Sequence, residues 1–399
     1  FKKYGKCTGF KKVGFDPISK SYTYDFFRSN GSLTGFQFSL GPDGRFSDFI
    51  PQGTITPSPK LRRQQRFVAM DDGTLLQTIV FTDSTSSESR PTFLIRSPYF
   101  HINSVFQKYL YVPTAQDFTE RGFNLVIQAI RGTGLSEGRY QIFHPIEIAD
   151  GTKTVEWITS QTFSNGQVFA VGTSYDGFTA LATAIGNPRG LVGVIAGGAP
   201  TDLGTDGFYR EGPLVLALLN YLHYSQTGRG FPLPLVESKF LKFVEPVFSE
   251  PDLTRYDNIL FNKNIPEWDL IAKNYPDPQA KFWNTRKIRH LVKNIQVPTL
   301  HSAGLYLDGD LVDTIRNFKA AQGASHHYLL LGNWTHGGST PYGPSNTTKE
   351  FKNIFWKFVS QVRNQQKISL APLTILSSNH SIFSGNSNPP KLYSMDTPL

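Results

Sequence analysis

The sequence predicts an α/β fold built on a doubly wound, mostly parallel β-sheet, and three observations support this. Short apolar runs alternate with helical patterns from about residue 66 onward. The runs are nearly continuous, as expected for parallel strands that are covered on both faces. Apolar residues make up 39% of the 399 residues and charged residues 18%, which is a globular composition on a chain that exceeds the usual single-core length.

The candidate strands of this sheet are six apolar runs, at residues 92–96, 124–130, 168–172, 191–196, 298–302 and 327–332. Helical patterns occupy residues 152–159, 175–185 and 310–322. The last of them ends at Gly323, where glycine favours the end of a helix. Strands that alternate with helices are typical of a doubly wound sheet.

Two segments depart from this alternation. The first 60 residues contain short alternating runs and glycine turns, which predict a β-rich extension. After Thr201 helical patterns and proline-rich turns replace the alternation, which predicts a helical cap inserted into the core. The expected organisation is an N-terminal extension at 1–60, core at 61–200, cap at 201–296 and the second part of the core at 297–365.

The charge distribution of the chain does not indicate a particular binding partner. The net charge of +9 is scattered, and its densest cluster is Lys60, Arg62, Arg63 and Arg66. A nucleic-acid interface would gather basic residues on one face, so we expect none. No run approaches the ~18 apolar residues that a membrane span needs.

A single cysteine, Cys7, excludes an internal disulfide and a thiolate metal site, and we expect no metal or other cofactor. The chain begins at Phe1 without a methionine, so either a leader has been removed or this is a fragment. The compartment is weakly determined, with a secreted or periplasmic location favoured over a cytoplasmic one. The oligomeric state is left open, a homo-oligomer included.

The strongest local signal is a candidate nucleophile at Ser174. A buried strand runs into Gly172-Thr-Ser-Tyr-Asp-Gly177 and then into a helix. A nucleophile on such a sharp turn needs small neighbours, and the turn aims the Tyr175 amide at developing negative charge. The second glycine stands three residues after the serine, so the Gly-x-Ser-x-Gly template fails. An ordinary β-turn-α connection with a helix-capping serine is the alternative.

Candidate partners follow in the order serine, acid, histidine that α/β serine enzymes of this kind use. The strand at 298–302 leads to Asp308 and Asp310, and the strand at 327–332 leads to His336. An imidazole activates the serine hydroxyl, and a carboxylate fixes the imidazole tautomer. We favour Asp308 over Asp310 as that acid; a plain helix N-cap is the alternative for both.

Several ordered motifs together resemble one family, the X-Pro dipeptidyl peptidase, cocaine esterase and α-amino-acid ester hydrolase group. They are Met70-Asp-Asp-Gly73, Arg96-Ser-Pro-Tyr99, Arg131-Gly-Thr-Gly-Leu-Ser-Glu-Gly138, Asp150-Gly, Val155-Glu-Trp157, Ser164-Asn-Gly166, Gly172-Thr-Ser-Tyr-Asp-Gly177, Tyr306-Leu-Asp308 and Gly332-Asn-Trp-Thr-His-Gly337. The resemblance runs from about residue 66 to residue 336. It implies the α/β-hydrolase fold, and it accounts for the spacing of the glycine after Ser174.

The resemblance also implies further site residues. An oxyanion hole would consist of the Tyr99 hydroxyl and the Tyr175 amide; for Tyr99 alone, a core or loop aromatic is the alternative. Acidic residues hold a substrate ammonium group in some members, and Asp176, Asp310 and Asp313 are candidates here. Trp334 is a further candidate for substrate binding. Metal ligands are not implied.

Other positions depart from the family pattern. Ala129 stands where the family has aspartate, and Asn333 stands where it has proline. Family members continue into a C-terminal β-sandwich of jelly-roll type, and residues 366–399 resemble only its start. We expect either a truncated chain or a protein that has lost this domain.

The sequence therefore predicts a serine hydrolase that cleaves ester or amide bonds of small acyl substrates through an acyl-enzyme on Ser174. The alternatives are an X-Pro dipeptidyl peptidase or α-amino-acid ester hydrolase, and a non-catalytic protein on a hydrolase scaffold. The expected partner is a small-molecule ester or amide, or a short peptide.

Overall fold

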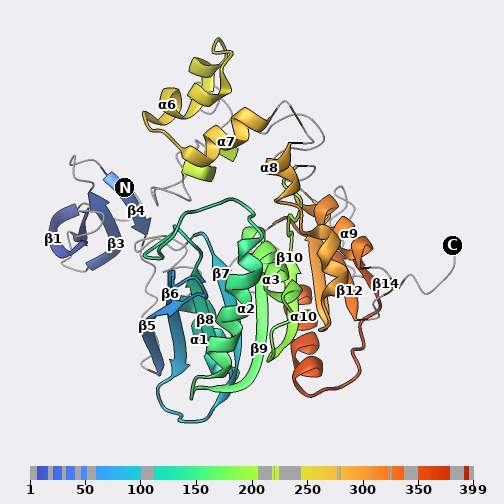
Figure 1. Cartoon of the computed structure of the whole chain (residues 1–399). Helices are drawn as coiled ribbons and strands as arrows, with labels where there is room; N and C mark the ends of the chain where they lie inside the picture. The colour runs from blue at the N-terminus through green and yellow to red at the C-terminus, as the bar shows by residue number, and fades with distance from the viewer. Residues whose placement is uncertain are drawn as a thin grey trace.

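The chain folds into two β-sheets with helices packed on the larger one (Figure 1). The computed structural model describes residues 7–16, 21–28, 33–40, 46–51, 60–99, 112–204, 218–219, 221–223, 244–275, 277, 280–306, 308–321, 323, 326–336, 349–377 and 391–394. The predicted α/β class with a mostly parallel sheet is confirmed.

The smaller sheet belongs to the N-terminal extension, which was expected to be β-rich. It consists of four antiparallel strands in sequence order: β1 (Cys7–Asp16), β2 (Ser21–Arg28), β3 (Leu33–Leu40) and β4 (Phe46–Pro51). Neighbouring strands are connected directly, as in a meander.

The larger sheet has ten strands in the order β14-β13-β12-β11-β10-β9-β7-β8-β6-β5. The strands are β5 (Leu61–Ala69), β6 (Leu75–Asp83), β7 (Arg90–Ser97), β8 (Asn124–Ala129), β9 (Ser164–Thr173), β10 (Leu191–Gly197), β11 (Thr299–Gly304), β12 (His327–Gly332), β13 (Leu373–Ser377) and β14 (Lys391–Ser394). Strands β7 through β13 are parallel, and antiparallel pairing closes both edges of the sheet.

The strand order reverses between β7 and β9. The chain leaves β7 for β8 on one side and returns to β9 on the other side. In open α/β sheets such a reversal leaves a crevice at the carboxyl ends of the strands, where ligands bind. Tyr99 and Ser174 follow their strands at this reversal.

Helices cover both faces of the large sheet, which explains why its strands are apolar throughout. Phe93 and Ile95 of β7 face a cluster that includes α1 (Val112–Glu120) and α10 (Lys349–Arg363). Leu94 faces the opposite cluster with α2 (Ile146–Thr159) and α3 (Tyr175–Ile185). Successive strand residues point to opposite faces, so both faces need apolar side chains. Helix α9 (Leu311–Ala320) packs beside β11 and β12.

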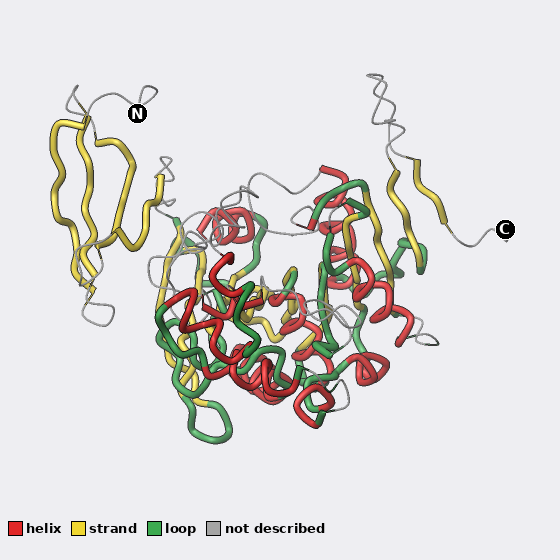
Figure 2. The backbone as a smooth tube through the Cα atoms, turned by 90° about the horizontal axis from the view of Figure 1, so that it is seen from above, coloured by secondary structure: helices red, strands yellow, loops and turns green. Residues whose placement is uncertain are grey.

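The segment between β10 and β11 covers the residues for which a helical cap was predicted. Its described part contains short helices: η2 (Glu245–Val247), η3 (Leu253–Arg255), α6 (Tyr256–Phe261), α7 (Pro266–Asn274), α8 (Lys281–Asn284) and η4 (Arg289–Asn294). Trp268 and Ile271 of α7 pack in one cluster with Tyr175, at the carboxyl end of β9. The tube in Figure 2 shows helices and loops gathered around the strands of the large sheet.

The C-terminal strands join the large sheet. Residues 366–399 were expected to resemble the start of a separate β-sandwich, but β13 pairs in parallel with β12 and β14 pairs with β13. The intervening residues 378–390 lie outside the described residues. Among the described helices, none has the length and apolar character needed to cross a membrane.

Candidate active site

Ser174 occupies a sharp turn between β9 and α3. Its backbone lies at φ 61° and ψ −128°, a region that non-glycine residues rarely adopt. A Cβ atom at Gly172 would overlap the carbonyl of Asp176, and one at Gly177 would lie 2.8 Å from the carbonyl oxygen of Gly197. The tightness of the turn therefore accounts for the glycine three residues after the serine.

The turn is fastened to the neighbouring strand. The Ser174 amide donates a hydrogen bond of 2.8 Å to the carbonyl of Gly197, the last residue of β10. The Ser174 side chain is partly exposed, while Tyr175 and Asp176 behind it are buried. The hydroxyl of Ser174 is thus held at the carboxyl edge of the sheet by a strained but well-supported backbone.

Asp308 and His336 form a hydrogen-bonded pair after the next two strands. The Nδ1 atom of His336 lies 2.8 Å from Oδ1 of Asp308. The other carboxylate oxygen of Asp308 accepts the Gly304 amide at 2.7 Å, and Oδ1 also accepts the Asp310 amide at 3.2 Å. The Asp308 side chain is 0% exposed, whereas that of His336 is 36% exposed. The carboxylate is therefore buried behind a ring that reaches solvent.

Asp310 is the more distant of the two acids that the sequence left open. Its Oδ2 atom lies 3.8 Å from His336 Nδ1, beyond hydrogen-bond range, and its side chain is 16% exposed. Asp310 also precedes α9 in the N-cap position, although its side chain makes no capping hydrogen bond. The geometry favours Asp308 as the direct partner of the imidazole.

Gly198 links this pair to the turn at Ser174. A Cβ atom at Gly198 would lie 2.9 Å from both Cε1 and Nδ1 of His336 and 3.4 Å from Oδ1 of Asp308. Its neighbour Gly197 accepts the Ser174 amide, so the imidazole and the serine flank the same two glycines. The sequence analysis missed Gly198; its signal was the Gly197-Gly198 pair at the end of a predicted strand.

Asp308 and His336 each favour the charged form of the other. Burial opposes ionisation of Asp308, but hydrogen bonds from His336 and from the Gly304 and Asp310 amides bring the pKa of Asp308 below its ordinary value. Burial lowers the pKa of His336, while the Asp308 hydrogen bond and the Asp310 and Asp308 charges outweigh it and raise the pKa above 6.5. The imidazolium is thus favoured next to Asp308.

Tyr99 lies beside Ser174, at the end of β7. Burial raises the pKa of the Tyr99 phenol well above its ordinary value, and nearby Tyr221 and Asp176 raise it further, while a hydrogen bond with the Ser174 side chain acts in the opposite direction. Tyr99 therefore remains a protonated hydrogen-bond donor. Its ring packs edge-on against that of Tyr221, with centroids 6.1 Å apart.

Tyr221 belongs to the expected cap, and its contact with Tyr99 was not predicted because no sequence spacing relates the two residues. Helix α3 begins at Tyr175, whose side chain is buried. Its hydroxyl accepts the Phe143 amide at 3.0 Å and donates to the Gln141 carbonyl at 3.4 Å. These bonds fix the first residue of α3, and with it the backbone amide that follows Ser174.

The remaining predicted residues divide into two groups. Asp176 is 2% exposed and close enough to Tyr99 to affect its pKa, so it lies near the turn. Trp334 is 6% exposed and packs in the apolar core against Phe351, with ring centroids 5.7 Å apart. The Trp334 side chain therefore belongs to the core and not to the Asp308–His336 cluster.

One group of ligating side chains close enough to share a metal ion is present in the described part of the chain. It consists of Asp308, Asp310 and His336, whose ligand atoms lie within 4.8 Å of one another. The hydrogen bond between Asp308 and His336 joins two of these side chains, and such a contact fits an acid–imidazole pair.

Comparison with known proteins identifies the family. Residues 72–338 match the model of the X-Pro dipeptidyl-peptidase (S15) family. The chain belongs to this family. The matched region runs from the turn before β6 to just past His336, and so includes every residue of the site described above.

A curated relative of known name is longer than the region it shares with this chain. Cocaine esterase from Rhodococcus sp. is 26% identical over 291 residues, which are 68% of this chain and 48% of the esterase. The chain thus spans about half the length of this esterase.

Two solved structures share the fold. An aminopeptidase from a marine sediment Thaumarchaeota archaeon aligns with a TM-score of 0.65 at 20% identity, over 85% of this chain and 61% of that one. An α-amino acid ester hydrolase aligns with a TM-score of 0.63 at 19% identity, over 81% of this chain and 59% of that one.

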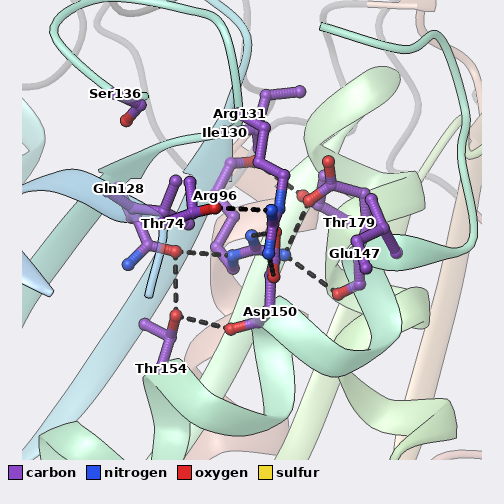
Figure 3. Close-up of polar contacts among 12 residues, drawn as sticks. Thr74, Arg96, Gln128, Ile130, Arg131, Ser136, Glu147, Asp150, Thr154 and Thr179 are labelled. Atoms are coloured by element: carbon purple, nitrogen blue, oxygen red, sulfur yellow. Dashed lines mark hydrogen bonds and ion pairs between the residues drawn. The ribbon is translucent and has the colours of Figure 1, made fainter. Parts of the chain in front are cut away.

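Behind the site of this S15 chain lies a buried network of charged residues (Figure 3). Arg96 of β7 lies 2.8 Å from a carboxylate oxygen of Glu147 and donates to Gln128 at 2.8 Å. Arg131 binds both carboxylate oxygens of Asp150, at 2.6 and 2.7 Å. The sequence analysis noted Arg96 and Arg131 as parts of motifs but did not predict their shared network.

Proposed function

We propose that this chain is a serine hydrolase that cleaves ester or amide bonds of small acyl substrates through an acyl-enzyme on Ser174. His336 acts as general base and Asp308 orients it. The Tyr99 hydroxyl and the Tyr175 amide stabilise the oxyanion. The observation that carries this proposal is the Asp308–His336 pair beside Gly198, next to a serine held at φ 61°.

The proposed reaction begins with attack on the substrate carbonyl carbon by the Ser174 oxygen. The hydroxyl proton passes to Nε2 of His336, since Nδ1 is engaged with Asp308. The carbonyl oxygen becomes an oxyanion that accepts hydrogen bonds from Tyr99 and the Tyr175 amide. When the tetrahedral intermediate collapses, the leaving group takes the proton from His336. Water then repeats these steps and releases the acid.

The raised pKa of Tyr99 supports its part in this scheme. An oxyanion hole requires a donor that keeps its proton, and burial keeps the phenol neutral. The strained turn supports the part of Ser174, because strain at a non-glycine residue marks functional sites.

A second candidate is the release of a residue or dipeptide with a free ammonium group, as an X-Pro dipeptidyl peptidase or an α-amino-acid ester hydrolase does. The observation that favours it is the pair of extra carboxylates at the site. Asp310 lies 3.8 Å from His336, and Asp176 is near Tyr99. Either carboxylate would attract a substrate ammonium group.

The proposal is tested with a fluorophosphonate probe, which phosphonylates activated serines. We expect the wild-type protein to be labelled and Ser174→Ala to be unlabelled. Ser160→Ala, which changes an exposed serine at the end of α2, should be labelled like the wild type. We expect Ser174→Ala to lower kcat by about 10⁶-fold, and a loss of only tenfold would mean that another residue is the nucleophile.

The two substrate classes are separated by comparing p-nitrophenyl acetate with Gly-Pro-p-nitroanilide. Faster turnover of the acetate supports the general esterase, and faster turnover of the dipeptide anilide supports the second candidate. A folded protein that neither reacts with the probe nor turns over either substrate would contradict both and favour a non-catalytic role.

A further inference from the structure

The buried network in Figure 3 includes Arg96, which lies close in the chain to the proposed oxyanion residue Tyr99. Arg96 stands three residues before Tyr99 on the same chain segment, and its guanidinium is 1% exposed. Besides Gln128 and the Glu147 carboxylate, it donates to the Glu147 carbonyl at 3.0 Å and lies 3.8 Å from Asp150. The end of β7 is therefore fixed against β8 and α2 by charged side chains.

The backbone of Arg96 is fixed as well, by the helix that follows Ser174. The Thr179 hydroxyl lies 2.6 Å from the Arg96 carbonyl oxygen and 2.9 Å from the Asp176 carbonyl, and it shares its proton between them. Thr179 is 0% exposed and stands on α3, five residues after Ser174. This side chain thus connects the strand that presents Tyr99 to the helix that presents the nucleophile.

Stability alone is a poor explanation for so many buried charges. Removing charges from water costs several kcal/mol per ion, and apolar replacements of a buried pair are often neutral or stabilising. Arg96, Glu147 and Asp150 are each no more than 2% exposed. A planar guanidinium with several acceptors is suited to fixing an orientation, because its donors point in set directions.

We propose that Arg96 and Thr179 are positioning residues for the oxyanion site, which fix the Tyr99 hydroxyl relative to Ser174. The inference rests on the proposed function and adds residues that do not touch the substrate. Thr179 acts through the Arg96 carbonyl, and Arg96 holds the strand through its side chain. Small displacements of a positioned group are costly in enzymes, since a shift of ~1 Å can reduce the rate by about 10²-fold.

Helix α3 offers a matched control. Thr183 is also 0% exposed and lies one turn beyond Thr179. Its hydroxyl donates to the Thr179 carbonyl at 2.8 Å, a bond that stays within α3 and does not reach β7. Thr179→Val and Thr183→Val each remove one buried hydroxyl while the side-chain shape is kept. Only the first removes a bond between α3 and β7.

The experiment is a double-mutant cycle with Tyr99→Phe. The rate constant for fluorophosphonate labelling of Ser174 and the kcat and KM for p-nitrophenyl acetate are measured for the wild type, each valine variant, Tyr99→Phe and the two double variants. We expect Thr179→Val to lower kcat and the labelling rate by roughly 10- to 100-fold with KM changed less than about threefold. In the Tyr99→Phe background, Thr179→Val should lower kcat and the labelling rate by less than about threefold, because the Tyr99 hydroxyl that Thr179 positions is absent.

Other outcomes would overturn the inference. If Thr179→Val lowers kcat by the same factor in the wild-type and Tyr99→Phe backgrounds, Thr179 does not act through the Tyr99 hydroxyl. If Thr183→Val loses as much activity as Thr179→Val, the effect belongs to the helix in general. Thermal unfolding of every variant shows which of them remain folded at the assay temperature, and kinetics are compared among those. If wild-type Ser174 is not labelled at all, the proposed function fails and this inference fails with it.

Discussion

At the scale of single residues, the carboxylates of Asp308 and Asp310 lie close together but differ in burial and in contact with His336. Asp308 is fully buried, accepts two backbone amides and contacts the imidazole, whereas Asp310 is partly exposed and 3.8 Å away. A carboxylate that orients a catalytic imidazole must itself be held in place, as the backbone hydrogen bonds hold Asp308. Asp310 contributes mainly charge.

This difference predicts different kinetics for two matched substitutions. Asp308→Asn should reduce kcat by about 10⁴-fold, since the amide imposes the wrong tautomer on His336. Asp310→Asn should reduce kcat by less than about tenfold, because it removes only a nearby charge. Steady-state kinetics on p-nitrophenyl acetate measure both. Equal losses, or a larger loss for Asp310→Asn, would assign the orienting role to Asp310.

The pH dependence of kcat/KM tests whether Asp310 affects the pKa of His336. The pKa of His336 is raised, so the acid limb of kcat/KM should have its midpoint above 6.5, with activity lost as the imidazole takes up a proton at lower pH. Since the Asp310 charge is one cause of the raised pKa, Asp310→Asn should shift that midpoint downward. An unchanged midpoint would indicate that Asp310 does not interact with the imidazole.

At the scale of elements, the central strands could be predicted from the sequence, and the ones at the edges could not. All six predicted runs coincide with β7 to β12, because a strand buried on both faces leaves a continuous apolar run. Helix α3 has the predicted bounds. Helix α2 begins at Ile146, six residues before the predicted start. Its first turns carry Glu147 and Asp150, whose tertiary contacts with Arg96 and Arg131 stabilise them.

The same reasoning explains which site residues could be predicted. Ser174 and His336 follow strands in a set order, so chain position makes them candidates. Chain position leaves both Asp308 and Asp310 open, and only the structure shows that Asp308 contacts the imidazole. Tyr99 needed the family resemblance, and the roles of Tyr221, Thr179 and Gly198 needed the three-dimensional contacts. Side chains that meet across elements leave no periodic pattern in the chain.

Helix α10 was not predicted, although its apolar residues recur on one face. Phe351, Phe355 and Phe358 are buried against the sheet, and the ring of Phe355 lies 5.8 Å from that of Phe93. We expect Phe355→Ala to lower the free energy of unfolding by about 3–5 kcal/mol, because it leaves a cavity in the core. Phe67→Ala, on edge strand β5 with 48% exposure, should cost less than about 1 kcal/mol. Urea unfolding measures both, and similar costs would place α10 outside the core.

At the scale of the whole molecule, the buried network couples folding stability to pH. Burial is the main cause that raises the pKa of Glu147 to about 7, and the charge of Asp150 adds to it, although Arg96 opposes both. The folded protein therefore binds the Glu147 proton more tightly than the unfolded chain, in which the pKa is near 4.5. The stabilisation from this proton is complete below pH 4.5 and is lost as the pH rises to about 7.

This sign leads to a prediction for Glu147→Gln, whose amide carries no titrating proton. Between pH 5 and pH 7.5, the free energy of unfolding of the wild type should fall relative to that of the variant. Urea unfolding at several pH values measures the difference. A difference that stays constant, or that changes in the opposite sense, would show that Glu147 is ionised throughout this range in the folded protein.

The parallel sheet also has a far edge, at the amino ends of β7 and β9. There the chain turns through exposed residues 87–89 before Arg90, and Asn165 lies exposed at the start of β9. Tyr99 and Ser174 stand at the opposite ends of these same strands, a full strand length away. With Cys7 as the one native thiol, a cysteine introduced at Ser87 gives a second attachment point for a dye or a solid support. Attached to a support through residue 87, the molecule would turn the ends of β7 and β9 that hold Tyr99 and Ser174 toward the solution.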